Sequence, residues 1–290
     1  MNVSRNSLIL LVIFAIGIAL RVYFGLSRPT GDLQFYIVLE QSQSTLLGFA
    51  KEIRFYPLLL FPSESSRIYV LAVVTALLFV MALRQITLRS DEKITYITLL
   101  IVLSNWYFAQ IDMHLIRQQI AIYFFILMIS QRTFGVLMII LGVFSIFYHE
   151  IALLLISSWI AAILLVKFRL LFIRKLLFYI SVLLIPMLYI QGATNGSIFL
   201  GYTILGFYLV KKESMRVSLG DIISISILSS LSLISLDLIS SVNFTRIIGV
   251  LVSLSLFRLM FDGKFQLSNR NIKLTGFLLT LSLYGVISSV

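Results

Sequence analysis

The chain contains no cysteine, few acidic residues and little charge of either sign. The absence of cysteine from 290 residues excludes disulfides, thiolate chemistry and cysteine-based metal sites. Only 12% of the residues are charged, whereas 60% are hydrophobic, and the mean hydropathy is +1.04. This composition lies far outside the range of soluble domains. It predicts an all-α fold, that of a polytopic integral membrane protein.

Other features are also missing from the sequence. No small-x-small cleavage site follows the basic and apolar N-terminal stretch, so we expect a retained signal anchor. No charge-rich linker, low-complexity tail or internal repeat divides the chain, and residues 1–290 are therefore predicted to form a single transmembrane helical domain. His114, His149 and Glu150 lack the spacing of a metal site, and the predicted outer face carries no DxD pair. We accordingly expect no metal and no cofactor.

Apolar runs of the length needed to cross a hydrocarbon core set the predicted architecture. They predict about eleven transmembrane helices, within a range of 10 to 12, at 7–25, 67–83, 94–110, 116–130, 134–148, 151–166, 176–190, 197–210, 219–236, 246–260 and 274–290. The serine-rich helix near 219–236 is expected to use its small residues for close helix contact.

The basic residues fix the predicted orientation. With a cytoplasmic N-terminus, the inner loops hold Arg5, Arg84, Arg89, Lys93, Arg132, Lys167, Arg169, Arg174, Lys175, Lys211, Lys212, Arg216, Arg258, Lys264, Arg270 and Lys273. The inner acids are Asp91, Glu92, Glu213, Asp221 and Asp262, so the whole net charge of +11 faces the cytoplasm. The remaining basic and acidic residues lie outside and cancel. This distribution is the positive-inside bias, and it accounts for the charge without a nucleic-acid partner.

The outer side is predicted to carry the long segment 26–66, which we interpret as a loop with an interfacial element. Loops of this length are usually functional. The part at 46–62 holds charged residues at its centre, which argues against a full crossing. The other outer turns are short, among them 111–115 and 149–150.

Polar residues gather where the predicted helix 116–130 begins. On a helix, His114, Arg117, Gln118 and Ala121 would share one face. An interfacial arginine that reaches to lipid headgroups would explain Arg117 alone. The concentration of His, Arg and Gln residues favours a binding site instead.

Three further groups map to the same predicted membrane face. His149 and Glu150 form the turn between two apolar helices, where either could accept a proton or simply serve as turn polarity. Asp32 and Arg54 lie in the long outer segment, and Arg246 opens a late helix from outside.

These residues resemble a known family. HLIRQQIA at 114–121, FSIFYHEIALLL at 144–155, a Gly-Asp pair ending at Asp32 and an arginine opening a late helix resemble the EpsG-like family of bacterial exopolysaccharide membrane proteins. The likeness extends from about Arg21 to Leu155, and beyond Lys167 only Arg246 supports it. Glu150 departs from the family pattern, in which a small or hydroxyl residue often follows the histidine.

The resemblance implies a GT-C-like membrane glycosyltransferase of the Wzy type. Such an enzyme polymerises undecaprenyl-diphosphate-linked oligosaccharide repeat units of O-antigen, capsule or exopolysaccharide, at the outer leaflet of the bacterial inner membrane. It works beside a flippase and a chain-length regulator, and its site faces the periplasm or exterior.

The resemblance also suggests roles for the polar residues. Departure of the lipid diphosphate develops negative charge, which a guanidinium fork binds better than an ammonium does. We expect Arg117 and Arg246 to bind the diphosphate, assisted by Arg54, His114 and Gln118. Asp32, His149 and Glu150 are unranked candidates for the general base that takes the proton of the acceptor hydroxyl.

Two other functions fit a membrane protein of this composition. A flippase for lipid-linked oligosaccharide would move the same substrate, but transporters usually show repeated halves and polar groups near the midplane. A polysaccharide-modifying acyltransferase would use a membrane histidine, but both histidines here are predicted to face outward.

Overall fold

The computed structural model describes residues 5–27, 33, 57–58, 60–87, 108–109, 112–113, 115–131, 133–184 and 219–235. These residues contain seven α-helices and no β-strand, which confirms the all-α prediction for this part of the chain. The helices are α1 (Arg5–Ser27), α4 (Glu64–Thr87), α6 (Ile116–Ile129), α7 (Val136–Tyr148), α8 (Ile151–Lys167), α9 (Leu171–Leu184) and α12 (Leu219–Ser235).

Six of these helices begin and end within a few residues of the predicted apolar runs. The exception is α9, which begins at Leu171 although the predicted run is 176–190. The prediction excluded Arg174 and Lys175 as charged, but the structure places Arg174 in the helix, where Asp221 of α12 neutralises it. The predicted helices at 197–210, 246–260 and 274–290 lie outside the described residues.

The described residues fall into two compact units, one up to His149 and the other from Glu150. The single-domain prediction for residues 1–290 stays a prediction. Of the predicted helix at 94–110, the structure describes residues 108–109, and of the outer segment 26–66 it describes only the ends and Leu33.

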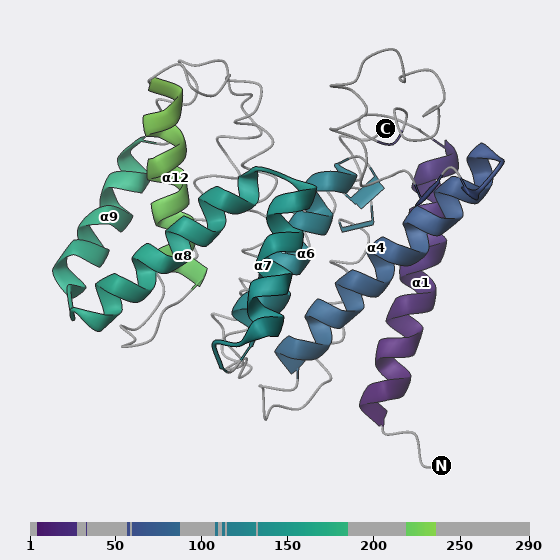
Figure 1. The fold of residues 1–290 in the computed structure, drawn as a ribbon, viewed down its shortest axis with the longest axis horizontal. Coiled ribbons are helices and arrows are strands. Elements are labelled where there is room, and N and C mark those ends of the chain that lie inside the picture. The colour runs from purple at the N-terminus through teal and green to yellow at the C-terminus, as the bar shows by residue number, and fades with distance from the viewer. Residues whose placement is uncertain are drawn as a thin grey trace, which may run out of the picture. The chain divides into compact units, whose positions relative to one another are not determined.

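In the first unit, α1 packs against α4, α4 against α6, and α6 against α7 (Figure 1). Helix α1 comes close to its neighbours at Gly25. A Cβ atom on this residue would stand 2.6 Å from Cγ2 of Ile68 and 2.9 Å from Cε of Met113. Gly25 therefore permits a contact that any larger residue would prevent.

The start of α4 is fixed by a serine pair. The N–H of Ser66 donates to Oγ of Ser63 at 3.1 Å, and the N–H of Ser63 donates to Oγ of Ser66 at 3.2 Å. This reciprocal arrangement is a capping box, which satisfies two of the backbone donors that a helix start leaves without partners.

In the second unit, α12 packs against both α8 and α9 (Figure 1). The buried hydroxyl of Ser226 donates to Oγ of Ser158 at 2.9 Å, which is the close contact through small residues expected of the serine-rich helix. At the start of α12, Asp221 accepts from Arg174 of α9, with Nε–Oδ1 at 3.1 Å and Nη2–Oδ2 at 2.6 Å.

The turn between α8 and α9 contains a left-handed residue, Arg169, with φ of 57°. The N–H of Leu170 donates to the carbonyl of Leu165 at 2.9 Å, and the N–H of Arg169 donates to that of Val166 at 3.0 Å. These two bonds define a Schellman motif, whose left-handed position is usually glycine.

Two helical segments, Leu8–Ser27 and Glu64–Gln85, are long and apolar enough to cross a membrane. The apolar helices α6, α7 and α8 are shorter. By length and composition, the described residues therefore show two candidate spans, which weakly suggests association with a membrane.

Candidate functional site

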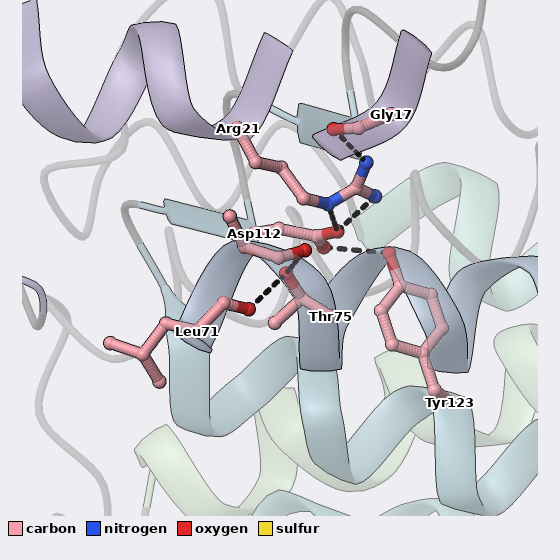
Figure 2. A network of polar contacts seen from close by, with 7 residues as sticks. Gly17, Arg21, Leu71, Thr75, Asp112 and Tyr123 are labelled. Carbon is pink, nitrogen blue, oxygen red and sulfur yellow. Dashed lines mark hydrogen bonds and ion pairs between the residues drawn. The ribbon is translucent and has the colours of Figure 1, made fainter. Parts of the chain in front are cut away.

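A buried carboxylate joins three parts of the first unit. Asp112 Oδ2 accepts from Nε of Arg21 at 2.8 Å and also from Nη2 of the same guanidinium. Asp112 Oδ1 accepts from the hydroxyl of Tyr123 at 2.6 Å. The remaining guanidinium nitrogen, Nη1, donates to the carbonyl of Gly17 at 2.9 Å (Figure 2). Asp112 thus connects α1, the segment before α6, and the second turn of α6.

No part of this network is exposed, because Arg21, Asp112 and Tyr123 all have zero relative accessibility. Burial raises the pKa of the Asp112 carboxyl, which lies between the predicted spans, while the Arg21 charge and the Tyr123 hydroxyl oppose the rise. The Arg21 guanidinium lies 5.3 Å from the ring centroid of Phe79, within cation–π range. Both charges of the pair are therefore compensated.

The start of α6 carries Arg117 and Gln118, two of the residues predicted to bind a diphosphate. The residue before the helix is Leu115, and among the described residues no side chain caps the helix start. Arg117 is half-buried and Gln118 is buried. An uncapped helix start directs backbone N–H groups and a partial positive charge outward, which suits an anion.

Gln118 has an unusual environment. Its side chain is 2% exposed, and neither Oε1 nor Nε2 has a hydrogen-bond partner within the part of the chain that the structure describes. Buried polar groups are nearly always hydrogen-bonded, and each exception needs an explanation such as a functional role. An amide that offers both a donor and an acceptor beside Arg117 is suited to a ligand with phosphate or hydroxyl oxygens.

The α6–α7 hairpin brings His149 to the level of Arg117. The two helices are antiparallel neighbours, and the buried Ser145 hydroxyl donates to the carbonyl of Ala121 at 2.7 Å. Arg117 lies one turn before Ala121, and His149 lies one turn after Ser145. The two residues therefore occupy the same end of the hairpin. The ring of Tyr148 stacks on Phe124, with centroids 5.8 Å apart, and holds this register.

Among the other predicted site residues, the structure describes only Glu150. The exposed Glu150 begins the second unit, just before α8. Asp32, Arg54, His114 and Arg246 lie outside the described residues, so the expected convergence of Arg117 with Arg246 stays a prediction. Within the described part, Arg117, Gln118 and His149 are the predicted site residues that come to one end of the first unit.

Arg21, Asp112 and Tyr123 were not predicted as site residues. Arg21 and Asp112 are separated by 91 positions, so no local pattern connects them. A usable signal was nevertheless present, because an arginine inside an apolar run requires a nearby counter-charge. Asp112 is the acid closest in sequence to the predicted site at the start of α6.

No protein-family model, curated protein or solved structure matches this chain.

Proposed function

We propose that the chain is a multi-pass inner-membrane glycosyltransferase that polymerises undecaprenyl-diphosphate-linked repeat units outside the cytoplasm, as its resemblance to the EpsG-like family suggests. The observation that carries the proposal is the buried Gln118 amide beside Arg117 at an uncapped helix start. This combination of donors matches the negative charge that a departing diphosphate develops.

Exposed apolar surface supports the membrane location. Helix α7 buries only Met138, Gly142 and Ser145 among its residues. Its exposed side chains are almost all large and apolar: Val136, Leu137, Ile139, Ile140, Val143, Phe144, Ile146 and Phe147. Contiguous apolar surface of this kind marks a contact with lipid or protein rather than with water.

Two ion pairs agree with the predicted grouping of residues by membrane side, whichever side is cytoplasmic. Arg21 and Asp112 were both predicted on the outer side, and they are hydrogen-bonded to each other. Arg174 and Asp221 were both predicted on the inner side, and they form the second pair. Each contact therefore joins residues that the predicted topology assigns to the same side.

In the proposed reaction, the hydroxyl oxygen of the acceptor sugar attacks the anomeric carbon of the donor. A new C–O bond forms, and the bond from the anomeric carbon to the diphosphate oxygen breaks with its electron pair on the diphosphate. Arg117 and Gln118 bind that leaving group, with Arg246 and Arg54 as further candidates. The hydroxyl proton passes to a general base, for which His149 has the best-supported position because it lies level with Arg117.

Substitution of Gln118 by leucine tests the proposal. Because a buried amide without partners costs stability, Gln118→Leu is expected to leave the fold as stable as the wild type, or more stable by about 1 kcal/mol. The same change should shorten or abolish the surface polysaccharide of a deletion strain complemented with the variant. Polymer length on a gel and protein level on a blot measure the two effects.

A matched control lies on the chain directly after the same helix. Gln131 is part-buried, and its Nε2 already donates to the carbonyl of Leu127 at 2.8 Å. Gln131→Leu should cost a little stability and leave the polymer at full length. The Arg117→Lys variant, which keeps the charge but loses the fork, should show single repeat units on the surface. Full-length polymer from both Gln118→Leu and Arg117→Lys would refute the proposal that the chain is a polymerase. A cell surface with no repeat units at all would favour a flippase.

A further inference from the structure

Asp112 is hydrogen-bonded to Tyr123, and these two residues flank in sequence the residues proposed to bind the diphosphate. Arg117 and Gln118 lie between Asp112 and Tyr123 in sequence, and the hydroxyl of Tyr123 donates to Oδ1 of Asp112 at 2.6 Å. This contact between two side chains therefore ties the segment before α6 to the second turn of α6, on either side of the turn that carries Arg117 and Gln118. Figure 2 shows the Tyr123 ring reaching from α6 to this carboxylate.

The same carboxylate is itself held from outside α6. Arg21 of α1 donates to Oδ2 through Nε at 2.8 Å and through Nη2, and its Nη1 is fixed on the carbonyl of Gly17 at 2.9 Å. A guanidinium fork has directional donors, so it sets the orientation of the carboxylate as well as its charge. The position of the first turn of α6 thus depends on α1.

Stability alone does not require such a network. A buried ion pair can often be replaced by apolar residues without loss, because desolvation offsets the attraction between the charges. The hydrogen bonds instead specify one position for the atoms that they join. A binding group that is misplaced by about 1 Å can lose about 100-fold in rate.

We infer that Asp112 and Tyr123, oriented by Arg21, are positioning residues that hold Arg117 and Gln118 in place for a diphosphate ligand. This inference rests on the proposed function. The three residues touch no substrate, and they act through the backbone of the first turn of α6.

The test uses the full-length protein purified in detergent micelles, with undecaprenyl diphosphate as the probe and undecaprenyl monophosphate as the comparison. Tyr123→Phe removes one hydroxyl from the network. We expect it to weaken diphosphate binding about tenfold per folded molecule, and monophosphate binding much less, because positioning matters most for a ligand held at several points. Arg21→Lys, which retains the charge but loses the fork, is expected to act in the same direction.

Thr75→Val is the matched control. Thr75 is also fully buried, but its hydroxyl donates to the carbonyl of Leu71 within α4 at 2.8 Å and lies outside the carboxylate network. The valine variant should bind both lipids as the wild type does. The comparison separates the loss of any buried hydroxyl from the loss of this particular one.

Each result decides between the two proposals. If Arg117→Lys and Gln118→Leu bind the diphosphate as the wild type does, these residues do not form a diphosphate site, and the proposed function is refuted. Loss of binding in those two variants, combined with wild-type binding per folded molecule in Tyr123→Phe, would overturn only the positioning inference. A Tyr123→Phe protein that does not fold would also overturn it, since the hydroxyl would then have a structural role.

Discussion

Each of the two units contains an arginine–aspartate ion pair between distant helical segments, but the surroundings of the pairs differ. The Arg21–Asp112 pair is completely buried and shares its carboxylate with Tyr123. The Arg174–Asp221 side chains are 11% and 14% exposed, and Asp221 lies in the first turn of α12. In the second unit, water can solvate Arg174 when Asp221 is removed, and the start of α12 can stabilise Asp221 when Arg174 is removed. The fully buried pair of the first unit has no such replacement. The same two residue types should therefore contribute very differently to stability.

The largest effect is expected from Asp112→Asn. The variant would leave the Arg21 guanidinium charged and fully buried without its counter-ion, which costs about 3 to 5 kcal/mol of unfolding free energy. Denaturant titration of the purified protein in micelles measures this loss. Combining Asp112→Asn with Arg21→Met removes both charges and should recover part of it. A loss below about 1 kcal/mol for the single variant would show that water reaches this pair as well.

Gly25→Ala should have an intermediate effect in the same unit. The added methyl group would overlap Cγ2 of Ile68, which belongs to a stiff β-branched side chain, so α1 must move away from α4. Overpacking of this kind costs about 1 to 3 kcal/mol. The double variant Gly25→Ala with Ile68→Ala makes room for the methyl group and should lose less than the two single changes added together. If the stability losses of the two single variants simply add in the double variant, the methyl group at position 25 does not contact Ile68.

The smallest effect is expected from Asp221→Asn in the second unit. Partly exposed ion pairs contribute up to about 1 kcal/mol, and salt screens them. The loss should therefore shrink further when the titration is repeated in 1 M salt, whereas that of Asp112→Asn should persist. An equal salt dependence for both pairs would remove the distinction between the two units.

The helices could be predicted from the sequence where apolar composition alone determines where a helix begins and ends. The runs that became α1, α4, α6, α7, α8 and α12 are bounded by charged or polar residues, and the structure follows those boundaries closely. The start of α9 could not be predicted in this way, because the charged residues Arg174 and Lys175 lie inside the helix, where Arg174 pairs with Asp221. A partner 47 residues away leaves no trace in a local pattern.

The candidate site could be predicted only in part, for a similar reason. Arg117 and His149 could be placed at the same end of two neighbouring helices, since a short hairpin must bring the end of one helix level with the start of the other. A local pattern cannot reveal that the Gln118 amide has no hydrogen-bond partner among the described residues, because that depends on which side chains surround it in three dimensions. Nor could it reveal that Asp112 bonds both Arg21 and Tyr123. A polar residue next to an apolar run shows that a partner is needed, but not which residue supplies it.

The left-handed conformation of Arg169 has a consequence for membrane insertion. This residue adopts a backbone geometry that glycine accepts more easily, yet it is one of four basic residues in the stretch predicted to stay in the cytoplasm. Glycine at position 169 would relieve local strain and, if the proposed orientation holds, would also remove one of the positive charges that keep this loop in the cytoplasm. In the proposed topology, therefore, the positive charge that orients the loop and the relaxed backbone that glycine would allow are opposing requirements at this turn.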